Sequence, residues 1–178
     1  MTRACAAAVW RTCDSPLGQF AVAAQAHAVI AVVLPGCPGP QAVIEIENEA
    51  ERRRAEELAA RACAQLTEYF AGERTHFRLP TDLLLTRGPF AARVQRALEE
   101  IPYGETRSYG QLAAMVGNPR AVRAVGSACA RNPIPIVLPC HRVLAARGAP
   151  GGCAGGLDMK KALLRLENSV VAETGLTS

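Results

Sequence analysis

Four consecutive residues, Pro139-Cys140-His141-Arg142, place a thiol directly beside an imidazole and a guanidinium. A cysteine with an ordinary pKa near ~8.5 is mostly a neutral thiol at neutral pH, and a neighbouring base or cation raises the fraction of reactive thiolate. The residues ahead of it, 132–138, include two prolines, which predicts a stiffened approach to the thiol. The tetrapeptide therefore indicates either an activated nucleophile or a buried structural cysteine with an incidental histidine beside it.

Upstream of this motif, the sequence predicts two short helices with the spacing of a helix-turn-helix. The first covers residues 109–116 and ends at a turn of Gly117 and Asn118. The second covers residues 119–130, with Pro119 at its first position and Asn118 as its N-cap. This pair of helices is a candidate DNA-binding element.

The second predicted helix has one apolar face and one basic face. The 3.6-residue period places Val122, Val125 and Cys129 together on the apolar face. The opposite face carries Arg120, Arg123, Ala124, Ser127 and Arg131. Small side chains allow a helix to approach a phosphate-lined groove closely, while arginines neutralise phosphates. Buried structural alanines are the alternative interpretation, but the arginines between them favour contact with DNA.

The charge of the chain is unevenly distributed along the sequence. The formal net charge is +4, yet residues 1–86 hold 8 Lys/Arg against 10 Asp/Glu, whereas residues 87–165 hold 12 against 4. The positive charge therefore lies in the half that carries both motifs. An excess of this kind is expected of a region that binds a polyanion, although a solvated basic surface would produce the same count.

Composition narrows the class of protein. A chain of 178 residues that is 49% hydrophobic can bury a core, and its longest apolar run, residues 28–34, is too short to span a bilayer. Seven cysteines without framework spacing favour a reducing compartment, so we expect a cytoplasmic protein, or a nuclear one in a eukaryote. We expect no bound metal, because the candidate ligands match no regular zinc spacing. These candidates are Cys5, Cys13, His27 and Cys37.

The sequence predicts an α+β protein of two domains, residues 1–85 and 86–178. Short apolar runs at residues 9–12, 19–24 and 29–34 predict a small antiparallel sheet. Residues 48–70 have helical periodicity, with the arginine triplet 52–54 on the solvent side. Residues 75–89 are predicted to form a linker, and the domain that follows is predicted to be mainly helical.

Several motifs together, in order and spacing, resemble the O6-alkylguanine-DNA alkyltransferases over residues 85–170. They are Ile101-Pro-Tyr-Gly-Glu105, Ser108-Tyr-Gly-Gln-Leu-Ala113, Asn118-Pro-Arg-Ala-Val-Arg-Ala-Val-Gly126, Asn132-Pro-Ile-Pro-Ile136, Pro139-Cys-His-Arg-Val143 and Gly155-Gly-Leu157. The resemblance implies a winged-helix-like helix-turn-helix that inserts into the minor groove of double-stranded DNA. It also implies single-turnover transfer of an alkyl group from a flipped O6-alkylguanine, and from O4-alkylthymine, to Cys140. No cofactor is implied, and we expect a monomer that does not bind membranes.

The resemblance also implies roles for individual residues. His141 acts as a base on Cys140 through a water molecule, Glu167 orients the imidazole, and Asn132 braces the turn before the cysteine. Arg142 is expected to pack between the two domains. Tyr109 and Arg123 promote nucleotide flipping, the first by crowding a phosphate and the second by filling the vacated stack. The substrate pocket is expected to comprise Tyr109, Val143, Cys153, Ala154 and Gly155.

Two positions depart from the family pattern. Gln95 stands where a tryptophan commonly follows the valine of its helix, which is expected to change core packing. Cys153 stands where a tyrosine usually forms part of the pocket, which removes one wall and one hydrogen-bond donor. The second departure leads us to expect a more open pocket that accepts benzyl as well as methyl groups.

Three other functions are compatible with parts of the sequence. The first is a non-enzymatic protein that senses alkylation damage with the same DNA-binding domain, although Cys140 is present. The second is a cysteine hydrolase, which leaves the basic small-residue helix unexplained. The third is a transcription factor that uses the helix-turn-helix in the major groove, which leaves the Pro-Cys-His-Arg motif unexplained.

Overall fold

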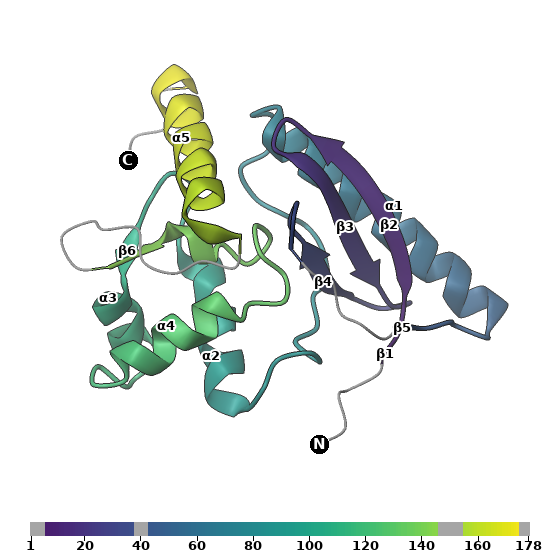
Figure 1. Ribbon diagram of the computed structural model, residues 1–178, viewed down its shortest axis with the longest axis horizontal. Helices are drawn as coiled ribbons and strands as arrows, with labels where there is room; N and C mark the ends of the chain where they lie inside the picture. The colour runs from purple at the N-terminus through teal and green to yellow at the C-terminus, as the bar shows by residue number, and fades with distance from the viewer. Residues whose placement is uncertain (1–5, 38–42, 146–154, 175–178) are drawn as a thin grey trace. The chain divides into compact units, whose positions relative to one another are not determined.

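The computed structural model describes residues 6–37, 43–145 and 155–174 (Figure 1). The chain divides into two compact units, residues 1–85 and residues 86–178. The first combines a sheet with one long helix, and the second is mainly helical, so the predicted α+β class is confirmed. Across the three described segments, no helix has both the length and the apolar character needed to cross a membrane.

The first unit contains the predicted antiparallel sheet. Its strands β2 (Val9–Ser15), β3 (Gly18–Ala24) and β4 (Val29–Val33) pair in the order β2-β3-β4. A tight turn joins β2 to β3, because the Ser15 hydroxyl donates to the carbonyl of Gly18 at 2.8 Å and accepts from the amide of Leu17 at 3.1 Å. Gly18 has φ +115°, which is a conformation that side chains rarely allow.

One long helix, α1 (Glu49–Phe70), packs along a face of this sheet (Figure 1). The Asn48 side chain accepts a hydrogen bond from the amide of Glu51 and so begins the helix. Its apolar side packs into the core, where the rings of Phe20 and Phe70 lie 5.0 Å apart. The arginines at 52–54 are exposed as predicted, and Arg52 and Arg53 pair with glutamates of the same helix.

Two features of the first unit differ from the prediction. Strands β1 (Ala6–Ala7) and β5 (Val43–Ile44) form a parallel pair that was not expected, since two residues are too few to show alternation. The predicted linker is also wrong in part, because its Thr81 forms a parallel bridge with Val29 at the start of β4. There Val29 donates its amide to the carbonyl of Pro80 and accepts from the amide of Asp82.

The second unit contains four α-helices within the described residues. They are α2 (Pro89–Ala97), α3 (Tyr109–Met115), α4 (Val122–Ala130) and α5 (Gly156–Thr174). Helices α2, α3 and α4 pack against one another, and α3 and α4 form the predicted helix-turn-helix. Two short 3₁₀ turns, η1 (Leu98–Glu100) and η2 (Cys140–Arg142), and a parallel strand pair, β6 (Arg107–Ser108) with β7 (Val143–Leu144), complete the unit.

Helix α4 begins three residues later than predicted. Asn118 is not its N-cap, because its carbonyl accepts from the amide of Ala121 and closes a separate turn around Pro119. The helical hydrogen bonds then start from the carbonyl of Ala121. As a result Val122, which was expected on the buried face, is 41% exposed at the start of the helix. Val125 and Cys129 are buried as expected.

Candidate active site

The loop before Cys140 is held by the side chain of Asn132. Its Nδ2 donates to the carbonyl of Leu138 at 2.7 Å, and its Oδ1 accepts from the amide of Ile134 at 3.0 Å. Within this loop Ile136 has φ +73°, which is a costly conformation for a β-branched residue. The buried side chains of the loop and the amide of Asn132 together hold that conformation, so the backbone that leads to Cys140 is fixed.

Cys140 lies at the start of η2, where its own amide donates to the carbonyl of Leu138 at 2.8 Å. The amide of Arg142 donates to the carbonyl of Pro139 at 3.0 Å and closes the turn. The residue is almost fully buried, as is His141 beside it. A buried thiol next to a buried imidazole has little competition from solvent, which suits a nucleophile that must react with one particular atom.

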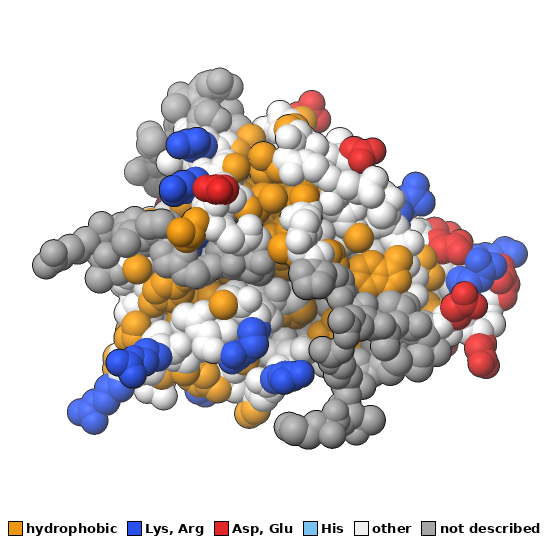
Figure 2. All heavy atoms as spheres, in the orientation of Figure 1, with side chains coloured by type: hydrophobic (Ala, Val, Ile, Leu, Met, Phe, Trp, Pro, Cys, Tyr) orange, Lys and Arg blue, Asp and Glu red, His pale blue; other side chains and the backbone are white. Residues whose placement is uncertain are grey.

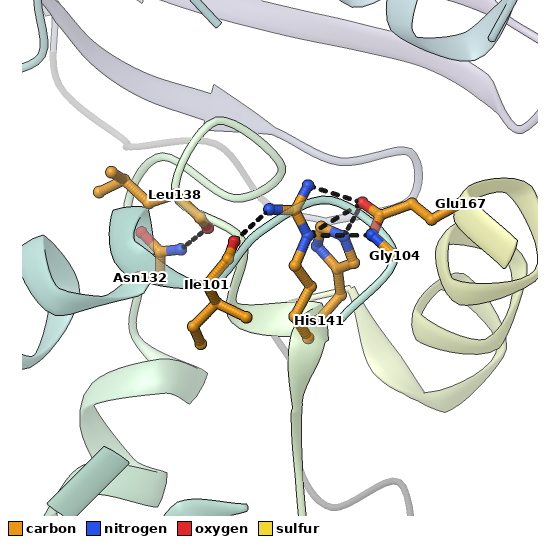
Figure 3. Close-up of polar contacts among 7 residues, drawn as sticks. Ile101, Gly104, Asn132, Leu138, His141 and Glu167 are labelled. Atoms are coloured by element: carbon orange, nitrogen blue, oxygen red, sulfur yellow. Dashed lines mark hydrogen bonds and ion pairs between the residues drawn. The ribbon is translucent and has the colours of Figure 1, made fainter. Parts of the chain in front are cut away.

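Glu167, on α5, collects three donors around one carboxylate (Figure 3). His141 meets it through Nε2 at 2.7 Å, and the backbone amide of Gly104 donates to it at 3.1 Å. Arg142 donates to both carboxylate oxygens, at 2.9 Å from Nε and 2.9 Å from the terminal nitrogen. The side chains of His141 and Glu167 are each about 1% exposed, so the network is shielded from bulk solvent.

Electrostatics keep this carboxylate ionised. Burial alone would raise the pKa of Glu167, but hydrogen bonds and charge from His141 and Arg142 outweigh burial and lower the pKa to about 2. The neighbouring phenol responds in the opposite direction, since burial and the negative charge of Glu167 raise the pKa of Tyr103 to about 12. At neutral pH Glu167 is therefore an anion that can orient the imidazole of His141 without taking its proton.

Arg142, which was expected to pack between the two domains, forms hydrogen bonds within the second unit. In addition to Glu167, it donates to the carbonyl of Ile101 at 2.6 Å, and its guanidinium lies 5.5 Å from the ring centre of Tyr103. The side chain thus ties η2 to α5 and to the turn after η1.

Tyr109 and Val143 are brought together by the short strand pair β6–β7. Arg107 pairs with Val143, and Ser108, the N-cap of α3, pairs with Leu144. Tyr109 follows Ser108 as the first residue of α3. It therefore lies near β7, the strand that follows Cys140 in the chain. The strand pair therefore explains how two residues 34 positions apart in the sequence lie close enough for Lys160 to approach both.

Lys160 is a buried residue of this region that sequence analysis missed. It is 0% exposed, its ammonium donates to the carbonyl of Val143, and it lies 5.8 Å from the ring centre of Tyr109. A signal was available, because Lys160, Leu163 and Glu167 have the i, i+3, i+7 spacing of one helix face. The lysine was overlooked because an ammonium is rarely fully buried.

Of the three arginines predicted for the outward face of the second helix of the helix-turn-helix, Arg123 lies within α4, Arg120 lies in the turn before it and Arg131 is its C-cap. All three are exposed, as is Ala124, and Ser127 is half-buried. Figure 2 shows basic side chains over the second unit's helices with few acidic ones near them, whereas basic and acidic side chains are intermixed over the first half of α1. Because few acidic side chains lie near these basic ones, their charges are available to attract the phosphates of a polyanion.

Of the residues predicted for the pocket, Cys153 and Ala154 lie outside the described residues, while Gly155 begins the last described segment just before α5. Among the described side chains, no group of three or more His, Cys, Asp or Glu could hold a metal ion. His27, one of the candidate ligands, instead lies 3.8 Å from the carboxylate of Asp82 on the surface.

Comparison with known families agrees with this arrangement. Residues 8–83 match the ribonuclease-like domain of 6-O-methylguanine DNA methyltransferase, and residues 89–169 match the DNA-binding domain of the same family. The chain belongs to the 6-O-methylguanine DNA methyltransferase family. The second match contains the whole Cys140, His141 and Glu167 arrangement, so the family's DNA-binding domain and the candidate active site coincide.

Individual relatives differ in how much of the chain they match. A methylated-DNA--protein-cysteine methyltransferase of Mycolicibacterium paratuberculosis is 57% identical over 109 residues, which cover 61% of this chain and 64% of that protein. A constitutive methylated-DNA--protein-cysteine methyltransferase of Bacillus subtilis is 42% identical over 159 residues, covering 89% of this chain and 94% of that protein. The crystal structure of Mycobacterium tuberculosis OGT in complex with DNA is 40% identical, with a TM-score of 0.77 over 90% of this chain and 93% of that one.

Proposed function

We propose that this chain repairs DNA by transferring the alkyl group of O6-alkylguanine to its own Cys140. The observation that carries the proposal is that Glu167 binds the imidazole of His141 in a buried site, and that the buried Cys140 is the preceding residue of the chain. Family membership and the exposed arginines on and beside α4 support DNA as the substrate. A protein with this function acts where the DNA is, which in a bacterial or archaeal cell is the cytoplasm, and it needs no second copy of itself.

The proposed transfer uses both nitrogens of His141. Nε2–H donates to Glu167, so Nδ1 is the nitrogen that accepts the thiol proton of Cys140 through a water molecule. The thiolate sulfur then forms a bond to the alkyl carbon while the bond between that carbon and O6 breaks. The electron pair stays with guanine, which takes up one proton and so balances the one lost by Cys140.

Arg142 makes Glu167 a positioning group and not a proton acceptor. The carboxylate shares its charge between Arg142 and His141, and this is why its pKa stays near 2. An imidazolium formed during the reaction is stabilised by the same carboxylate. The product is a thioether, which has no good leaving group, so each molecule reacts once.

Access to the O6 atom requires that the nucleotide leave the stack. We propose that α4 enters the minor groove, where Arg123 fills the vacated space and Tyr109 rotates the flipped nucleotide's phosphate. Arg123 is exposed on α4, and Tyr109 lies at the N-terminus of α3 near Val143. The minor groove offers little sequence code, which suits a protein that must act on any sequence. O4-alkylthymine offers the same alkyl–oxygen bond and is proposed as a second substrate.

Stoichiometry tests the proposal. Mixed with an excess of duplex DNA containing O6-methylguanine, the protein should gain one methyl group by intact-mass analysis and then stop. Cys140→Ala should gain none while still binding the duplex, since the thiol is buried and contributes little to the surface. Repeated turnover would contradict the thioether, and tight binding without any mass gain by the native chain would favour a non-enzymatic damage sensor.

Nucleotide flipping has its own test. Arg123→Ala should slow repair in duplex DNA far more than reaction with a free O6-alkylguanine base, because only the duplex requires an unstacking cost of a few kcal/mol to be offset. Arg120→Ala, on the same exposed surface, is the matched control and should lower affinity for all duplexes, damaged or not. Equal loss on duplex and free base in Arg123→Ala would mean that Arg123 shapes the pocket instead.

A further inference from the structure

Gln95 forms a buried polar link that the proposed mechanism does not use. The side chain lies on α2 and is about 1% exposed. Its Oε1 accepts from the hydroxyl of Thr86 at 2.5 Å, and its Nε2 donates to the carbonyl of Ala128 at 3.0 Å. A longer contact, at 3.5 Å, joins Nε2 to the carbonyl of Arg131. One amide therefore connects the start of the second unit, α2 and the end of α4.

The carbonyls that accept from Gln95 lie at the C-terminal end of α4, where backbone carbonyls lack partners within the helix. The last four carbonyls of an α-helix have no partner within the helix, and their usual partners are a left-handed glycine or a basic side chain in the last turn. Helix α4 has no basic residue in its last turn, and its C-cap Arg131 has φ −106° and not a left-handed conformation. The amide of Gln95 supplies the donor from a neighbouring helix.

This helix end is also the junction between the two functional parts of the unit. Arg123 lies upstream on α4, and Arg131 is followed at once by Asn132, which braces the loop before Cys140. A change in the direction of α4 at this junction would move Arg123 relative to Cys140. Gln95 binds the carbonyls of Ala128 and Arg131 at this junction. Its side chain therefore helps to set the distance between Arg123, which would enter the DNA groove, and the thiol of Cys140.

We propose that Gln95 is a positioning residue that fixes the orientation of α4 against the Cys140 loop, and so governs repair of a nucleotide within duplex DNA. The inference rests on the proposed function, because it assumes that α4 holds the duplex while Cys140 reacts. It gives a role to the departure from the family pattern at this position. A free base does not bind α4, so its reaction with Cys140 does not depend on that orientation.

Gln95→Met tests the proposal, because methionine has nearly the same length and volume but neither donor nor acceptor. Rates are measured with O6-benzylguanine within a duplex and as the free base, below the melting temperature of every variant. We expect the duplex rate to fall about five- to tenfold, which corresponds to the loss of one or two hydrogen bonds, and the free-base rate to change by less than about twofold. Thr86→Val, which removes only the bond to Oε1, should give a smaller loss in the same direction.

Val94→Ala is the matched control, because Val94 is buried on the same helix but offers no hydrogen bond to α4. It should lower the melting temperature and leave the ratio of the two rates unchanged. Equal loss on both substrates in Gln95→Met, no loss on either, or a duplex-selective loss in Val94→Ala would each overturn the inference. If Gln95→Met does not fold, Thr86→Val decides by the same criteria. A native chain that gains no methyl group from duplex O6-methylguanine would instead refute the proposed function, and this inference with it.

Discussion

The two units of this chain differ in how many of their polar side chains are buried. In the first, the ion pairs of α1 lie at the surface, and Gln65 is the buried polar residue among those described. In the second, several buried polar side chains are described, and three of them join in one network around Glu167. The buried polar residues of this unit are Gln95, Asn132, His141, Arg142, Lys160 and Glu167.

This difference distinguishes the apolar packing that stabilises the fold from the buried polar groups that serve the proposed chemistry. Burying charged groups costs several kcal/mol per ion before pairing is counted, and an apolar core of the same volume is often at least as stable. The first unit shows that this chain can fold on apolar packing of a helix against a sheet. The buried charges of the second unit are therefore best explained by the proposed reaction at Cys140.

The thiols make the same contrast. Cys13 on β2 and Cys63 on α1 share a hydrogen bond, which lowers the pKa of Cys63 and raises that of Cys13. The first unit thus contains a cysteine whose pKa is lowered. Its partner, however, is another thiol, whereas Cys140 is followed by His141 and its bound Glu167. Ionisation alone does not distinguish the nucleophile.

The largest expected effect comes from Glu167→Gln compared with Glu49→Gln. Both carboxylates receive three or more hydrogen bonds from cationic side chains and backbone. Removing the buried charge leaves Arg142 unpaired, so we expect Glu167→Gln to lose about 3–5 kcal/mol of unfolding free energy, and repair to become very slow. Glu49→Gln, on the exposed face of α1, should change neither within error. Urea denaturation and a repair assay measure both, and a similar loss in the two variants would contradict the comparison.

Acid should produce the next largest effect. The pKa of Glu167 is lowered from 4.5 to about 2 in the folded protein, so its contribution to stability is complete above pH 4.5 and is lost as the pH falls towards 2. A shift of this size corresponds to about 3 kcal/mol. The native chain should therefore lose stability over this window more steeply than Glu167→Gln does. Parallel curves for the two proteins would show that another group carries the acid sensitivity.

The smallest of these effects is expected from two side-chain amides that form hydrogen bonds to the backbone. Asn132 holds the loop before Cys140, and Gln65 on α1 holds both backbone groups of Arg78. Each alanine variant leaves such groups without a partner, which costs about 1–3 kcal/mol. The loss of stability should be similar, but only Asn132→Ala should also slow alkyl transfer to Cys140. Equal transfer rates in the two variants, measured where both are folded, would show that the loop needs no brace.

Much of the fold follows from local sequence patterns. The strands of the first sheet, α1 and the helix-turn-helix were predicted because alternation and helical period are properties of a few adjacent residues. The start of α4 was predicted wrongly, since Asn118 and Pro119 obey the local rules for a helix start but form a separate turn. The pairing of Val29 with the segment at Thr81 depends on tertiary contacts that no local pattern records.

The candidate site was only partly predictable for the same reason. Cys140 and His141 are adjacent, so their chemistry could be proposed from the sequence directly. Glu167 is 26 residues from His141 and was singled out by resemblance alone. The bonds of Arg142 to Ile101 and of Lys160 to Val143 join segments 41 and 17 residues apart, and a charged side chain is normally expected at the surface.

The position of the transferred group tests the central claim most directly. The native chain is reacted with duplex DNA containing O6-methylguanine with an isotopically labelled methyl, then digested, and each cysteine peptide is analysed by mass spectrometry. The account predicts one labelled methyl per molecule, on the peptide that contains Cys140, with Cys13, Cys63 and Cys129 unlabelled. Label mainly on Cys63, the thiol of the first unit whose pKa is lowered, would contradict it.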